Sequence, residues 1–108
     1  MTDYNTLNAV LAKFEMLTDA PYAYYEFKEP VTADRYVAFF ESEKIPHYAD
    51  NKTYTYDHGF AIELYTKVKE PETEEKLINL LAEYEIPWSG GETVKIDNDN
   101  VFMTTFYC

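Results

Sequence analysis

The fold is decided by residues 54–64, which read YTYDHGFAIEL. Odd positions in this stretch are mostly small or polar, and this alternation with a period of two is the pattern of a half-buried strand. The phase holds across Gly59, so the stretch predicts one strand longer than the usual five or six residues. We expect part of so long a strand to project beyond the core of a small domain, where a partner can pair with it. The even positions, which can face an apolar side, are Tyr54, Tyr56, His58, Phe60, Ile62 and Leu64, and the first three form the candidate assembly strand.

Helical patterns lie on both sides of this strand. Apolar residues at three- and four-residue spacing predict a first helix over residues 4–17, capped by Thr2 or Asp3 and ended at residues 19–21. A second helix is predicted to begin at Glu70-Pro71, because proline suits the first helical position, and to stop before Pro87. The expected buried stripes are Leu7, Val10, Leu11, Phe14 and Leu17 in the first helix, and Leu77, Leu80, Leu81 and Tyr84 in the second.

The remaining segments predict strands and turns. Residues 22–27 and 35–41 are rich in strand formers, residues 43–52 hold turn formers such as Pro46, and residues 89–91 read as a flexible turn. Residues 93–96 and 101–107 predict a hairpin across residues 97–100. Strands in blocks between helices predict an α+β fold, a mostly antiparallel sheet with two helices packed on one face. A length of 108 residues fits a single domain over residues 1–108.

Charge and composition narrow the possible partners. The chain has 20 acidic and 9 basic residues, a net charge of −11, which disfavours stable binding to a nucleic-acid backbone. No apolar stretch reaches the roughly 18 residues that a membrane helix needs, so we expect no membrane partner. The N-terminal residues lack the pattern of a signal peptide. Cys108, the only cysteine, can form neither an internal disulfide nor a zinc cluster, which favours a reducing cytoplasm.

Motifs for chemistry are missing from the sequence. Neither histidine, His47 or His58, belongs to a ligand set, and no serine or cysteine lies in a recognisable nucleophile motif. The run Asp-Asn-Asp-Asn at residues 97–100 starts like a calcium loop but has Phe102 and Cys108 where glycine and glutamate are required. We therefore expect a hairpin turn there, no cofactor, no metal and no enzyme activity.

Four segments carry a resemblance to a known family: YYEF at residues 24–27, YVAFF at 36–40, HYADNKTY at 47–54 and IELYTK at 62–67, the last followed by a glutamate-rich helix that ends at IPW, residues 86–88. In this order and spacing they resemble the tail terminator (tail completion) proteins of long-tailed bacteriophages, especially those of Gram-positive hosts. The resemblance spans about residues 7–107. It implies a virion structural protein that forms a ring, typically of six subunits, on the completed tail tube. Its expected partners are sister copies, the tail tube protein and the head–tail connector protein. The expected location is the host cytoplasm during assembly and then the virion.

Acidic residues in turns lead to a hypothesis about how such a ring would let DNA pass. Because the genome passes through the ring, acids that line or rim its lumen would keep DNA from sticking. Asp97, Asp99, Glu41 and Glu43 are the candidates. Two other functions stay open: a head-closure or other neck protein, and an acidic nucleic-acid mimic that inhibits a DNA-binding enzyme.

Overall fold

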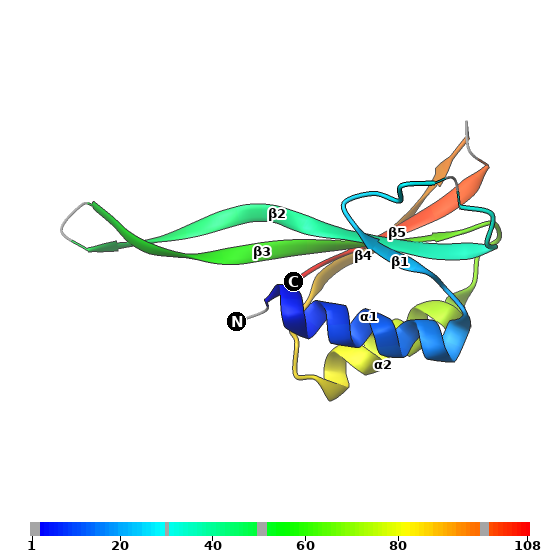
Figure 1. The fold of residues 1–108 in the computed structure, drawn as a ribbon, viewed down its shortest axis with the longest axis horizontal. Helices are drawn as coiled ribbons and strands as arrows, with labels where there is room; N and C mark the ends of the chain where they lie inside the picture. The colour runs from blue at the N-terminus through cyan, green and yellow to red at the C-terminus, as the bar shows by residue number, and fades with distance from the viewer. Residues whose placement is uncertain (1–2, 30, 50–51, 98–99) are drawn as a thin grey trace.

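Two helices cover one face of a five-stranded sheet, and a two-stranded ribbon extends from that sheet (Figure 1). The computed structural model describes residues 3–29, 31–49, 52–97 and 100–108. The strand order is β1-β2-β3-β5-β4, in which only the β1–β2 pair is parallel. The predicted α+β class is confirmed. The elements in chain order are α1 (Tyr4–Thr18), β1 (Tyr22–Tyr24), β2 (Arg35–Ala49), β3 (Lys52–Thr66), α2 (Pro71–Glu83), β4 (Ser89–Ile96) and β5 (Val101–Tyr107).

Both ends of α1 are set by local chemistry. Asp3 caps the start, since its Oδ1 accepts a hydrogen bond from the Thr6 backbone N–H at 2.7 Å. That bond stabilises the carboxylate and lowers the pKa of Asp3. At the other end Asp19 adopts a left-handed φ of 59° and donates its backbone N–H to the Glu15 carbonyl at 2.8 Å. The predicted cap and end of the first helix are therefore confirmed.

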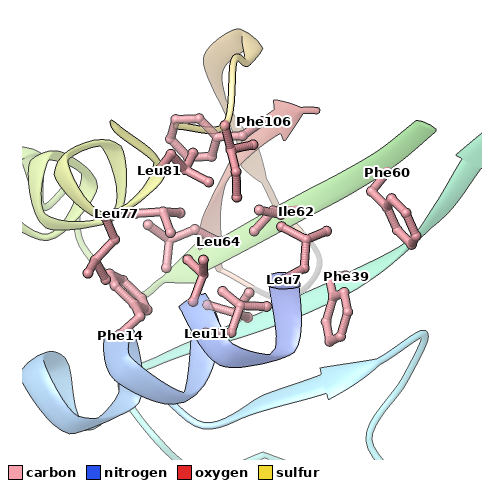
Figure 2. Packing of buried hydrophobic residues seen from close by; sticks show 14 of the residues in the cluster. Leu7, Leu11, Phe14, Phe39, Phe60, Ile62, Leu64, Leu77, Leu81 and Phe106 are labelled. Carbon is pink, nitrogen blue, oxygen red and sulfur yellow. The ribbon is translucent and has the colours of Figure 1, made fainter. Parts of the chain in front are cut away.

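The core lies between the helices and the sheet (Figure 2). Two predicted members of the helical stripes are wrong: Leu17 is 53% exposed and Tyr84 is 37% exposed. In the last turn of α1 the buried position is taken by Thr18 in place of Leu17, and Tyr84 follows the last residue of α2. The largest fully buried side chains are Phe14, Phe39, Phe106, Leu7, Leu11, Ile62, Leu64, Leu77, Leu81, Val10 and Val37.

Arg35 joins the two helices at the start of β2. Its Nη1 donates to the Thr18 carbonyl at the end of α1, at 2.9 Å, and its Nε donates to Glu70 Oε1 at 2.8 Å. The same Glu70 oxygen accepts a hydrogen bond from the Thr73 hydroxyl at 2.7 Å in the first turn of α2. Arg35 thus satisfies a carbonyl that the helix itself leaves unpaired and fixes where α2 begins.

The turn predicted over residues 43–52 is wrong for residues 43–49 and 52, because β2 continues to Ala49 and β3 begins at Lys52. Residues 50 and 51 lie outside the described residues. Pro46 misled the prediction: it is paired opposite Tyr56 within the ladder. Antiparallel pairs alternate between hydrogen-bonded and non-hydrogen-bonded, and the Pro46 pair belongs to the second kind. Its missing N–H therefore faces away from β3 and costs the ladder nothing.

The structure also corrects three predictions about shorter segments. The strand predicted over residues 22–27 covers only Tyr22–Tyr24, because Tyr25 has a φ of 69° and turns the chain out of the sheet. The flexible turn predicted at residues 89–91 is part of β4, where a bulge between Gly90 and Thr93 uses positive φ at Gly90 and Gly91. The uninterrupted phase predicted for residues 54–64 is also wrong at one end, since a second register shift leaves Tyr54 opposite no residue of β2.

Candidate assembly site: the arm and the crevice at its root

The ribbon beyond the body of the sheet, which we call the arm, consists of Glu43–Ala49 of β2 and Lys52–Gly59 of β3. Pairing of β1 with β2 ends at Tyr24 opposite Phe39, and the pairing of β5 with β3 ends where Cys108 meets Phe60. Beyond these points the described strands β2 and β3 pair only with each other. The arm accounts for the elongated shape of the molecule, 50 × 31 × 25 Å (Figure 1). The expectation that the long strand projects beyond the core is confirmed.

A bulge marks the root of the arm. Glu41 pairs with Phe60 and Glu43 pairs with Gly59, so Ser42 is one extra residue on β2. In a regular strand residues three apart point to opposite faces, but the extra residue allows Glu41 and Lys44 to meet. The Lys44 Nζ lies 2.9 Å from the Glu41 Oε1. The bulge therefore changes which residues share a face as β2 leaves the body.

Gly59 is the matching feature on β3. A Cβ built at this position would lie 2.8 Å from the Cγ of Glu43, so the absent side chain is what leaves room for Glu43 across the pair. A glycine in a strand often marks such a close approach. The root of the arm thus combines a bulge on one strand with a glycine on the other.

A crevice of about 830 Å³ lies where the arm meets the body. Three large apolar side chains that line it are partly exposed: Ile45 at 43%, Tyr84 at 37% and Tyr107 at 51%. Glu43 and Glu85 are the charged residues among those that line it. An exposed apolar rim around a hollow is typical of an interaction site. The full lining is Thr6, Ser42, Glu43, Ile45, Gly59, Phe60, Tyr84, Glu85, Ile86, Pro87, Ser89, Tyr107 and Cys108.

Cys108 pairs with Phe60 at this crevice. Its backbone exchanges two hydrogen bonds with Phe60, the Phe60 N–H donating to its carbonyl at 2.7 Å and its own N–H donating to the Phe60 carbonyl at 2.9 Å. Burial disfavours the thiolate and raises the pKa of Cys108 from 9.0 to about 11.

The thiol of Cys108 is therefore expected to react slowly in the folded protein. At pH 8 a shift of about two units lowers the thiolate fraction roughly a hundredfold, and thiol reagents attack the thiolate. We expect labelling by 5,5′-dithiobis(2-nitrobenzoate) at pH 8 to be slower by about that factor than in denaturant. Because the folded state keeps its proton while the unfolded state loses it, this thiol also makes stability fall as pH rises from 9 to 11. Equal labelling rates with and without denaturant would contradict the burial.

The predicted acids do not come together as one group. Glu41 lies at the root of the arm with a side chain only 18% exposed beside Lys44, and Glu43 lies exposed over Gly59. Asp97 lies exposed in the turn after β4, at the end of the sheet away from the arm. Asp99 lies outside the described residues, so its place is not assigned.

The candidate assembly strand lies in the arm. All three residues, Tyr54, Tyr56 and His58, lie in β3, and the last two pair with β2, while their side chains lie outside the described part of the structure. The crevice was not predicted from the sequence, because Ile45, Tyr84 and Tyr107 come from three separate segments. Only the excess of tyrosine, 11 residues, pointed towards half-exposed aromatic surfaces of this kind.

Charge is distributed unevenly between arm and body. Residues 43–59 contain three acids and two bases, so they contribute only −1 to the net charge of −11 and leave −10 on the rest. Helix α2 alone carries Glu72, Glu74, Glu75 and Glu83 against Lys76. The arm is therefore the part that another acidic molecule can approach with least repulsion.

Among the described residues, no three histidine, cysteine or carboxylate side chains are grouped as metal ligands would be. Within the same residues, no helix combines the length and apolar character needed to cross a membrane. No protein-family model matches the sequence, and no curated protein matches it either.

Proposed function

We propose that this chain is a phage tail terminator, a structural protein that forms a ring on the completed tail tube and offers the joining surface for the head connector. The observation that carries the proposal is the arm, a nearly neutral ribbon on an acidic body in which the described parts of β2 and β3 form ladders only with each other. Unpaired edges are templates for pairing with further strands, and this pairing is a common mode of protein assembly. The resemblance at residues 24–27, 36–40, 47–54 and 62–67 supplies the identity of the proposed partners.

Charge supports the same proposal. A ring of sister copies through which DNA passes must not retain the DNA, and a net charge of −11 per chain removes the attraction to phosphate. It also imposes repulsion between copies, which contacts between the nearly neutral arms would limit. Glu41, Glu43, Asp97 and Asp99 remain the candidates for the lumen or its rim.

The test of this function is the tail phenotype of phage particles made without the gene. A terminator stops tube growth, so we expect overlong tails without heads when particles are examined by negative-stain electron microscopy. Complementation with the wild-type gene is the control and should restore normal length. Tails of normal length beside heads that leak DNA would instead identify a head-closure protein.

The protein that this chain binds distinguishes a tail terminator from a nucleic-acid mimic. Immobilised protein should retain purified tail tube protein and should not retain a DNA-binding nuclease. Retention of the nuclease together with inhibition of its activity would contradict the terminator and favour the mimic.

A further inference from the structure

The face of the sheet that points away from the helices, which we call the second face, is almost free of charge. Phe39, Ile62 and Phe106 belong to the core on the helix side, and successive residues of a strand point to opposite faces. Their strand neighbours therefore lie on the second face, and Glu63 is the only charged residue among them. In a chain with 27% charged residues, such a sheet face is typical of a surface that packs against another apolar surface. The second face comprises the even residues of 36–40, the odd residues of 61–65 and 101–107, and Val94 and Ile96.

One side of the second face is covered by the chain itself. The described part of the segment that joins β1 to β2 lies on the side of the sheet away from the helices (Figure 1). The Tyr25 ring of this segment stacks on Phe40 with 5.9 Å between the ring centroids, and its Phe27 ring meets Tyr36 edge to face at 5.8 Å. A layer of side chains therefore raises the second face over β2.

The other side of the second face, over β4, is lower. Tyr36 lies opposite Tyr65 in the ladder, and Tyr65 lies opposite Met103. Met103 in turn lies opposite Val94, so these residues form one row across the face. Phe27 packs on Tyr36 at one end of the row, whereas Val94 at the other end is 50% exposed. A step therefore runs along the strands, with a raised side over β2 and a bare side over β4.

We propose that two copies of the free protein pack second face against second face, around a two-fold axis that runs along the strands between β3 and β5. Because the strand order is β1-β2-β3-β5-β4, this axis places β2 of one copy over β4 of the other, and β3 over β5. The raised side of each copy then fills the bare side of the other. A two-fold axis across the strands would instead bring the two raised sides together and hold the faces apart. Aligned sheets pack about 10 Å apart in this way.

The distribution of charge favours a second copy as the occupant. The acidic helix α2 lies on the other face of each sheet, so both copies of α2 point outward in this dimer. Two sheets about 10 Å apart already separate the helices by more than the screening length of about 8 Å at physiological salt. A strongly acidic or basic partner would find no matching set of charges on the second face, whereas a second copy supplies a surface equally free of charge.

The proposed axis also keeps the two Glu63 carboxylates from facing each other. Glu63 lies opposite Thr105 in the ladder between β3 and β5. Because the axis exchanges the positions of β3 and β5, Glu63 of one copy comes to lie over Thr105 of the other. A threonine hydroxyl can donate to a carboxylate, and one oxygen of Glu63 already accepts a hydrogen bond from the Tyr65 hydroxyl at 2.9 Å. The charge on this face therefore meets a donor across the interface.

This dimer goes beyond the proposed function, because it concerns the free protein and holds whether or not the protein caps a tube. Its test is sedimentation equilibrium of the full chain between about 1 and 300 µM. A single sheet face gives an interface at the small end of the specific range, so we expect the 12.7 kDa chain to form a dimer with a micromolar dissociation constant. A chain that is still monomeric at about 300 µM would overturn the proposal.

A substitution on the bare side tests whether the dimer uses the second face. Val94→Asp is expected to raise the dissociation constant about a hundredfold, because each dimer would enclose two carboxylates against the aromatic side chains of the raised sides. Val68→Asp is the matched control: it makes the same change at a valine that is 62% exposed between β3 and α2, and it should leave the dimer unchanged. Circular dichroism checks that both variants fold. Equal effects of the two substitutions would contradict the proposal.

A cross-link provides a measurement that does not depend on Val94. Thr105 lies on β5 beside the proposed axis, so Thr105→Cys in a Cys108→Ser background should be linked to its copy by a short bismaleimide that spans the sheet separation of about 10 Å. Met16→Cys in the same background lies on α1, 83% exposed on the outer layer, and should not be linked. Equal linking at both positions, or linking at Met16→Cys alone, would show that the copies meet through another surface.

Discussion

Phe14→Ala is expected to lower the free energy of unfolding by about 3–5 kcal/mol, the range for removing a buried phenylalanine ring. Phe14 is fully buried in the core cluster and lies close to Leu77 of α2 (Figure 2). The loss combines the transfer of the ring out of the core with the cavity left between the helices and the sheet. A small domain has a total stability of about 5–15 kcal/mol, so the variant would be close to unfolded.

The measurement is urea denaturation monitored by circular dichroism. The urea concentration at the unfolding midpoint is compared between variants whose free energy of unfolding has the same slope against urea concentration. Met16→Ala is the matched control, because Met16 lies on the same helix and is 83% exposed. Its expected change is within about 0.5 kcal/mol, the usual range for a surface substitution. Similar midpoints for Phe14→Ala and Met16→Ala would show that α1 does not pack against the sheet as described.

Removal of the arm is expected to abolish the proposed terminator function while the body stays folded. Replacing residues 42–59 with Asn-Gly leaves a four-residue loop across the pair Phe40–Ala61, a common hairpin length. The core residues of β2 and β3 stay in place, and an isolated two-stranded ribbon adds little stability of its own. We expect the melting temperature to change by only a few degrees, and phage yield to fall to the level of phage without the gene.

Two readouts separate assembly from folding in this variant. Thermal unfolding by circular dichroism reports the body, and complementation of the deletion phage with tail-length measurement reports the function. The variant Met16→Ala should complement fully. Normal tail lengths with the armless variant would show that the body alone caps the tube, and the proposed role of the arm would be wrong.

Sequence patterns predicted the elements whose structure depends on nearby residues or on a repeating apolar pattern. The helix starts marked by the cap Asp3 and by Pro71 at the first helical position depend on the residue and its next few neighbours, so both could be predicted from the sequence. The buried triplet Phe60, Ile62 and Leu64 followed from strict alternation, and the hairpin of β4 and β5 from its turn residues. The errors at Pro46 and at residues 89–91 share a cause: proline and glycine were interpreted from propensity, whereas their place in the ladder decides whether they break it.

By itself the sequence determined the α+β class, the two helices, the long strand and the acidic charge, because these depend on periodicity and composition. Only the tertiary structure decided that β2 accompanies β3 into an arm, that Cys108 pairs with Phe60, and that Ile45, Tyr84 and Tyr107 line one crevice. Those features arise from pairing between segments that are distant in the chain. The register of such pairing is set by the packing of all five strands together and not by any one of them.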